Sequence, residues 1–137
     1  MRQQEETLLT IRTESTWTYA SWVRFRLIQS GNNYALKGHY HKRKFSETPS
    51  RPKLQKVKVD TVWAESLVKK LYNAQIPAFP QPAIGFDGGF TILTIGNYLG
   101  SSSFRWWSEP PIGWETLDEI TKEFIQKFYD GICINEE

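Results

Sequence analysis

The fold is decided by residues 17–45, WTYASWVRFRLIQSGNNYALKGHYHKRKF. Apolar and polar residues alternate on both sides of the sequence Ser30-Gly31-Asn32-Asn33, and such alternation is typical of a strand with one buried face. Gly and Asn tolerate the positive φ angles of a tight turn. We therefore predict a β-hairpin with strands over 17–28 and 34–45.

A helix is predicted on the C-terminal side of this hairpin, after a proline-containing loop over 46–53 and a short strand over 54–59. Its buried side is expected from apolar residues at i, i+3, i+4 and i+7, which lie on one face of a helix. These residues are Ala64, Leu67, Val68 and Leu71. Asp60 or Thr61 is suited to cap the helix, because a side-chain oxygen there accepts a hydrogen bond from a free backbone N–H group.

A second hairpin and a second helix follow. FTILTIG, residues 90–96, and SSFRWWSE, residues 102–109, predict two strands joined by a turn. The last helix has one apolar stripe, formed by Leu117, Ile120, Phe124 and Phe128. We expect Thr116 and Glu119 to form a capping box at its start, and Gly131 to end it.

The chain is thus expected to form an α+β fold in the order hairpin, helix, hairpin, helix. Both helices are expected to pack on one face of an antiparallel sheet of four to five strands. Residues 16–131 are expected to form a single domain, and residues 132–137 a C-terminal tail. Residues 1–15 are polar and are expected to be a loose N-terminal segment, in which Leu8, Leu9 and Ile11 form at most a short edge strand.

The composition is that of a globular domain. The 137 residues include six Trp, and 15% are aromatic, so a small number of large side chains is enough to build the core. The charged fraction of 23% is ordinary for a folded domain. Cys133 is the only cysteine, which excludes an intrachain disulfide and a cysteine-based zinc site. The sequence has no signal-peptide pattern and no run of about 18 apolar residues, so we expect a cytoplasmic protein without a membrane segment.

The net charge of +2 hides a strong asymmetry between two halves of the chain. Residues 1–59 contain twelve Lys and Arg against four Asp and Glu, a net charge of +8. Residues 60–137 contain five against eleven, a net charge of −6. A separation of this kind can mark an anionic partner for the first half. The favoured interpretation is that the halves attract each other within one fold, or that most of these charges are simply solvated.

Residues 85–120, GFDGGFTILTIGNYLGSSSFRWWSEPPIGWETLDEI, resemble a group of small uncharacterised bacterial proteins. In that group an Asp-Gly turn, a strand, a Trp-Trp strand end, a Pro-Pro segment and a Trp-x-x-Leu helix start follow in order. The matching positions are Asp87, Gly88, Trp106, Trp107, Pro110, Pro111, Gly113, Trp114 and Leu117. The resemblance covers about a quarter of the chain and implies a bacterial cytosolic origin. In size and general character the chain is also similar to immunity proteins that neutralise polymorphic toxins, an analogy that does not fix function.

Candidate catalytic and metal-binding residues are few. His39 and His41 lie on one side of a predicted strand, but a metal site needs a third and usually a fourth ligand, which favours two surface histidines. Asp87 has the setting of a turn residue, and Glu109 ends a strand with no second carboxylate paired to it. No motif for nucleophilic, nucleotide-binding or metalloprotease chemistry occurs. We expect neither a metal nor a cofactor.

The segment WWSEPPIGW, residues 106–114, has two interpretations. It could form a groove for an extended ligand. The favoured interpretation is structural, in which the Trp rings fill a strand–helix corner and the two prolines stiffen the entry to the helix.

The strongest candidate site is the face of the predicted sheet that points away from the core. Aromatic and basic residues alternate there, a combination that suits base stacking with phosphate pairing and equally a protein-binding hot spot. The predicted binding residues are Trp22, Arg24, Arg26, His39, His41, Arg105 and Trp107. Lys37 and Arg43 fall on the same face. The alternative is an ordinary amphipathic surface on which Trp rings stack with Arg side chains.

Three functional hypotheses follow. The first is a non-enzymatic protein-binding module, with toxin neutralisation as one role, whose basic aromatic sheet face docks an acidic surface of another protein. The second is a nucleic-acid-binding module that uses the same face. The third is a small enzyme with a site between Asp87 and Glu109. A homodimer is also compatible with the sequence, because it would cover the second face of the sheet or its strand edges.

Overall fold

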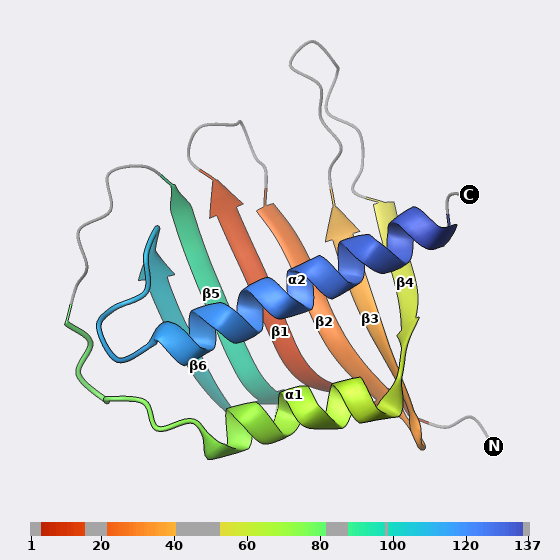
Figure 1. Cartoon of the computed structure of the whole chain (residues 1–137), viewed down its shortest axis with the longest axis horizontal. Helices are drawn as coiled ribbons and strands as arrows, with labels where there is room; N and C mark the ends of the chain where they lie inside the picture. Colours follow the sequence, from red (N-terminus) through yellow and green to blue (C-terminus); the bar gives the residue numbers. More distant parts are fainter. Residues whose placement is uncertain (1–3, 16–21, 41–52, 82–87, 98, 136–137) are drawn as a thin grey trace, which may run out of the picture.

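The computed structural model describes residues 4–15, 22–40, 53–81, 88–97 and 99–135. Within these residues six strands form one antiparallel sheet, and two α-helices lie across one of its faces (Figure 1). In chain order the elements are β1 (Glu6–Ser15), β2 (Trp22–Ser30), β3 (Asn33–Tyr40), β4 (Lys53–Val59), α1 (Thr61–Asn73), β5 (Gly89–Asn97), β6 (Gly100–Trp107) and α2 (Glu115–Asn135). The α+β class is confirmed, and the sheet has six strands instead of four to five.

The unexpected strand is β1, and it lies at the centre of the sheet. The strand order is β4-β3-β2-β1-β5-β6, so β1 pairs with β2 on one side and with β5 on the other. Leu9 and Ile11 are fully buried in the core. The prediction of a loose segment or a short edge strand over 1–15 therefore does not hold for 6–15, which form a long central strand.

An irregularity in β1 explains why its sequence did not predict a strand of this length. The pairing register with β2 shifts between Thr7 and Leu9. An extra residue at such a bulge breaks the alternation of buried and exposed side chains. The adjacent apolar residues Leu8 and Leu9 therefore look irregular in the sequence although both belong to one strand.

Both predicted hairpins are present. In the first, Ser30 pairs with Asn33 and Gly31 has a φ of 61°, as the turn chemistry predicted. The ends of its two predicted strands, residues 17–21 and 41–45, lie outside the described residues. In the second, β5 and β6 pair along their whole length and Asn97 Oδ1 accepts a hydrogen bond from the turn residue Leu99.

The helix starts and ends agree with the sequence in part. Asp60 caps α1, and its carboxylate accepts a hydrogen bond from the backbone N–H of Val62. The capping box at Thr116 does not form, because α2 begins one residue earlier and the Trp114 carbonyl accepts the first helical hydrogen bonds. Gly131 lies inside α2, which continues to residue 135, so residues 132–135 are helical rather than part of a tail.

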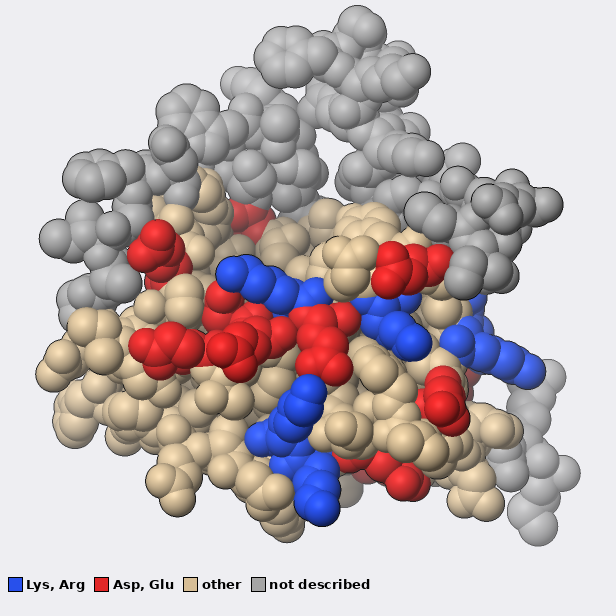
Figure 2. Space-filling model, viewed as in Figure 1, with Lys and Arg blue, Asp and Glu red and all other residues tan. Residues whose placement is uncertain are grey.

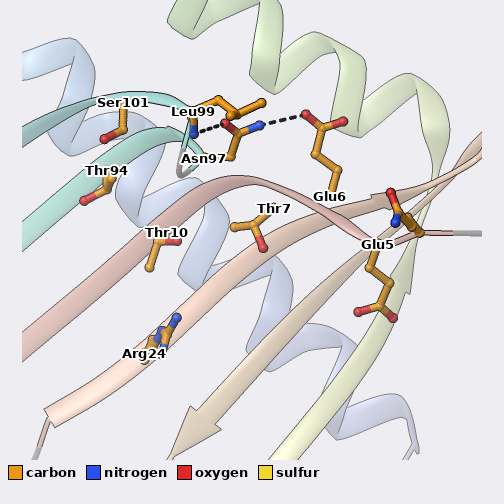
Figure 3. A pocket seen from close by; sticks show the side chains of 11 residues that line it. Glu5, Glu6, Thr7, Thr10, Arg24, Thr94, Asn97, Leu99 and Ser101 are labelled. Carbon is orange, nitrogen blue, oxygen red and sulfur yellow. Dashed lines mark hydrogen bonds between the residues drawn. The ribbon is translucent and has the colours of Figure 1, made fainter.

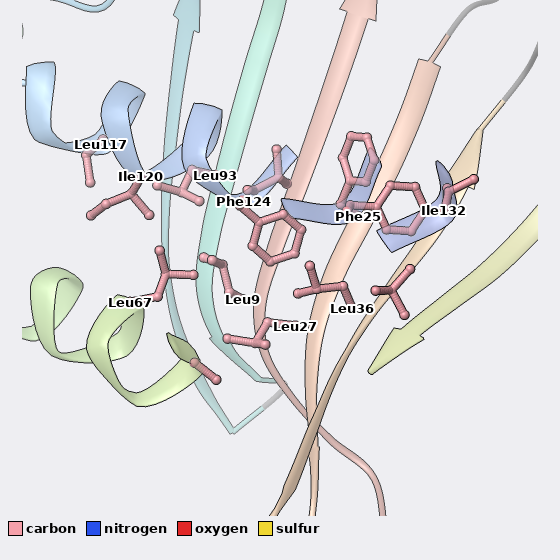
Figure 4. Close-up of a cluster of buried hydrophobic side chains, with 14 of the residues drawn as sticks. Leu9, Phe25, Leu27, Leu36, Leu67, Leu93, Leu117, Ile120, Phe124 and Ile132 are labelled. Carbon is pink, nitrogen blue, oxygen red and sulfur yellow. The ribbon is translucent and has the colours of Figure 1, made fainter. Parts of the chain in front are cut away.

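The core lies between the sheet and the two helices (Figure 4). Its aromatic centre is formed by Phe25 of β2 with Phe124 and Phe128 of α2, whose rings meet edge to face at centroid distances of 6.2 and 5.1 Å. All three rings are fully buried. The predicted stripe of α2 is buried throughout, and Ala64 and Leu67 of the predicted α1 stripe are buried as well.

Two glycines allow α2 to lie close to the sheet. A methyl group on Gly38 of β3 would overlap the Phe128 ring, and one on Gly131 would overlap the side chain of Val57 in β4. At both positions the missing side chain provides the space for a neighbour to pack. The C-terminal half of α2 therefore rests directly on β3 and β4.

The corner between β6 and α2 is filled by Trp side chains. Trp106 and Trp114 are buried, with ring centroids 6.4 Å apart, and the Trp114 indole N–H donates to the Pro77 carbonyl at 3.0 Å. Gly113, with a φ of 96°, lies against Pro77. This packing agrees with the structural interpretation of the segment 106–114.

No helix in the described part of the chain is long and apolar enough to cross a membrane.

We predict that Gly38→Ala lowers the free energy of unfolding by about 1–3 kcal/mol, the usual cost of overpacking a core. The added methyl group overlaps the Phe128 ring, which must move. Urea unfolding monitored by circular dichroism measures the change. Gly100→Ala is the control, because no atom lies within 4 Å of its Cβ position. Equal stability of the two variants would contradict the close packing of α2 on β3.

Candidate functional site

The sheet face opposite the helices, here called the open sheet face, contains most of the predicted binding residues. No described helix or strand covers it (Figure 1). Arg24 and Arg26 of β2 point to this face, because Phe25 and Leu27 between them are buried in the core. The pairing register places His39 beside Arg24. Arg105 and Trp107 lie on the same face of β6.

Like charges stand directly opposite each other on this face. In one row, His39 of β3, Arg24 of β2 and Arg12 of β1 are cross-strand neighbours. We call these three residues the arginine row. In a second row, here called the lysine row, Lys56 of β4, Lys37 of β3 and Arg26 of β2 are neighbours. Adjacent strands lie about 4.8 Å apart, so each row is a line of closely spaced basic side chains.

The two rows differ in how far carboxylates neutralise them. Glu5 pairs with Lys37 at 2.7 Å and with Lys56 at 3.9 Å, and the hydrogen bond from Lys37 lowers the pKa of the Glu5 carboxyl. Arg12 pairs with Glu14 at 3.1 Å. Among the described residues, Arg24 and Arg26 form no ion pair. The unpaired charge of this face therefore includes these two arginines.

An aromatic corner adjoins the arginine row on β5 and β6. Phe90 and Trp107 are cross-strand neighbours, and their rings meet edge to face with centroids 4.8 Å apart. The Arg105 guanidinium lies 3.8 Å from the centroid of the Phe90 ring, a cation–π contact. Arg105 is thus held over an apolar platform at the edge of the face.

Two predicted binding residues are not placed by the structure. His41 lies outside the described residues. The Trp22 backbone pairs with Glu14 at the start of β2, but its side chain is not described. The proposed His39 and His41 pair therefore has no observed geometry.

Several residues of the open sheet face were not among the predicted binding residues. They are Arg12 of β1, Lys56 and Lys58 of β4, and Phe90 of β5. A signal for the three basic residues was present, because the alternation in LTIRTE and in LQKVKV puts them on the face opposite the buried residues. It was not used, because neither segment was assigned to a long strand of the sheet.

The charge asymmetry along the chain becomes an asymmetry between faces. Figure 2, which views the helix side, shows Asp and Glu gathered in a band where α2 runs. The α2 sequence contains five acidic and two basic residues. The ion pairs observed between described side chains all join partners within one half of the chain. These pairs give no support to the interpretation that the two halves neutralise each other.

A hollow of about 800 Å³ opens on this face between the start of β1 and the β5–β6 hairpin (Figure 3). Thr7, Thr10, Thr94 and Ser101 line it with hydroxyl groups, and Arg24 lies at one end. At the other end Glu6 accepts a hydrogen bond from the Asn97 amide at 3.1 Å. Its volume is within the range of small-ligand sites.

The environment of His39 favours its neutral form. Partial burial is the largest cause that lowers its pKa, and the charges of Arg26 and Arg24 lower it further. The pKa of His39 therefore depends on the positive charge of the two neighbouring arginines. An anion placed beside Arg24 would raise the pKa of His39 again.

The described residues do not test the hypothetical enzyme site between Asp87 and Glu109. No group of three or more His, Cys, Asp or Glu among them could hold a metal ion. Glu109 is exposed after the end of β6, and Asp87 lies outside the described residues, so the hypothetical pair has no observed geometry.

The chain was also compared with known proteins. No protein-family model matches it, and no curated protein matches it.

We predict that His39 titrates below the ordinary imidazole pKa of about 6.5, and that Arg24→Gln together with Arg26→Gln raises its midpoint. NMR of the imidazole protons measures both values. Since the unfolded chain then binds the proton at higher pH than the folded chain, stability should fall as pH decreases through about 6.5. Lys69→Gln on α1 should leave the midpoint unchanged. A midpoint that does not respond to the arginine substitutions would contradict the described cluster.

Proposed function

We propose that the protein is a non-enzymatic binding protein that docks an acidic surface of another protein on its open sheet face. The observation that carries the proposal is the pair of like-charged rows. Like charges directly opposite each other on neighbouring strands destabilise a sheet. A surface that keeps them, with Arg24 and Arg26 unpaired among the described residues, is suited to a partner that supplies the missing negative charge.

The aromatic corner supports a protein partner over a nucleic acid. Trp and Arg are enriched among residues that dominate protein–protein binding, and Trp107 and Arg105 lie together here. Base stacking requires an open ring face. The Phe90 ring is already in contact with the Arg105 guanidinium and the Trp107 ring. The general likeness to immunity proteins makes an acidic toxin domain one partner of the required chemistry.

Carboxylates on the same face also favour a protein partner. Glu5 and Glu14 lie among the basic residues and pair with three of them. A phosphodiester backbone laid along the rows would meet these negative charges, whereas a folded protein surface presents its carboxylates at discrete positions. Electrostatic attraction would mainly speed association and orient the two proteins.

The test compares two double variants with the same change in net charge. Arg24→Gln/Arg26→Gln removes two unpaired cations of the open sheet face, and Lys69→Gln/Lys70→Gln removes two cations from α1. A partner is captured from a nuclease-treated bacterial lysate on the immobilised protein, identified and purified. Its Kd is then measured by calorimetry against each variant.

We predict a stoichiometric complex whose Kd rises at least about tenfold for the arginine variant, a loss of about 1.4 kcal/mol. The lysine variant should bind within about twofold of the wild type, because Lys70 makes only an exposed pair with Glu123. Equal binding by both variants would contradict the proposal. Capture that is abolished by nuclease would instead support the nucleic-acid hypothesis.

A further inference from the structure

The hollow on the open sheet face has opposite charges at its two ends. This inference rests on the proposed function and concerns the part of the partner that the hollow receives. Arg24 borders the hollow at one end, and Glu5 and Glu6 line it at the other, where the Glu6 carboxylate points to the Asn97 amide (Figure 3). The lining is therefore mixed in charge, although the face as a whole is basic.

The Arg24 end is suited to a carboxylate. Arg24 is exposed and forms no ion pair with a described residue. Arg12 and His39 flank it in the arginine row, where Arg12 is paired with Glu14 and the pKa of His39 is lowered. A guanidinium group binds a carboxylate through two parallel hydrogen bonds, which gives this end both affinity and direction.

The Glu6 end is suited to a hydrogen-bond donor. One Glu6 oxygen accepts from the Asn97 amide at 3.1 Å, and Asn97 in turn accepts from the Leu99 backbone at 2.9 Å. These bonds hold the carboxylate in place. A carboxylate has about four acceptor positions, so this contact leaves Glu6 able to accept a further donor. The neighbouring Glu5 carboxylate is already paired with Lys37.

The floor between the two ends is polar and open. Thr94 and Ser103 share a hydrogen bond of 2.7 Å, and Thr7, Thr10 and Ser101 add further hydroxyl groups along the hollow. Gly96 also lines it, with a φ of 105°, and a side chain there would overlap the Gly100 carbonyl. The hollow thus has no bulky side chain at this point.

We propose that the hollow receives one mixed-charge segment of the protein partner, with a carboxylate on Arg24 and a basic side chain on Glu6. Arg12 of β1 is the cross-strand neighbour of Arg24, and Glu6 lies at the start of β1. The positions of Arg24 and Glu6 are therefore separated by about 20 Å along the strand direction. An extended segment of about six residues spans this length. A uniformly acidic chain, such as a nucleic acid, would place negative charge against Glu6.

Fluorescent octapeptides and an oligothymidylate serve as probes, because the partner is unidentified. One peptide, DDGSGSKK, has mixed charge, and the other, DDGSGSDD, is acidic at both ends. We predict that the mixed peptide binds the wild-type protein about threefold more tightly than the acidic one, the factor that one exposed ion pair supplies. Fluorescence anisotropy at low salt measures both affinities. Tighter binding of the oligothymidylate than of either peptide would overturn the inference.

Three variants separate this inference from the proposed function. Glu6→Gln keeps an oxygen for Asn97 and should abolish the preference for the mixed peptide. Arg24→Gln should weaken both peptides. Lys58→Gln lies on the same face outside the hollow and should leave their affinity ratio unchanged. A preference that survives Glu6→Gln overturns the mixed-charge site but leaves the proposed function standing. Peptide binding that is insensitive to both Arg24→Gln and Lys58→Gln contradicts the proposed function as well.

Discussion

The contact between the Phe128 ring and the backbone of Gly38 determines how closely α2 lies against the sheet. Phe128 and Phe124 then meet Phe25 of β2 edge to face, and the rest of the core packs around these three rings. Both helices pack on this one face of the sheet (Figure 1). No helix in the described part of the chain covers the opposite face of the sheet, and the folding pattern thus creates the surface on which the proposed function depends.

Side-chain periodicity predicted the elements whose patterns are regular. The alternation around Gly31 predicted the first hairpin, and the stripe that ends in Phe128 predicted the buried side of α2. The bulge between Thr7 and Leu9 concealed β1, because an extra residue reverses the alternation that identifies a strand. Gly131 was predicted to end α2, but its role is to approach Val57, a long-range contact that no local pattern contains.

The candidate site was predictable in outline for the same reason. Arg24, Arg26 and His39 alternate with core residues of two long strands, so their common face followed from periodicity alone. The arrangement of these residues in rows did not follow from periodicity. It depends on the register between strands and on the central position of β1, which brings Arg12 beside Arg24. The hollow also depends on long-range pairing, since Glu6 and Asn97 meet only when β1 lies next to β5. Under the proposed function, binding and stability are opposed on this face, because the residues that would attract a partner repel one another.

The most direct test of this account is the free energy of unfolding of Arg24→Gln/Arg26→Gln, measured with urea at low and high salt. If the rows are retained for binding at the expense of stability, the variant should be more stable than the wild type at low salt. The expected gain is a few tenths of a kcal/mol to about 1 kcal/mol. It should diminish at high salt, where exposed charges are screened. A variant that is less stable at low salt would show that the arginines support the fold, and would contradict the account.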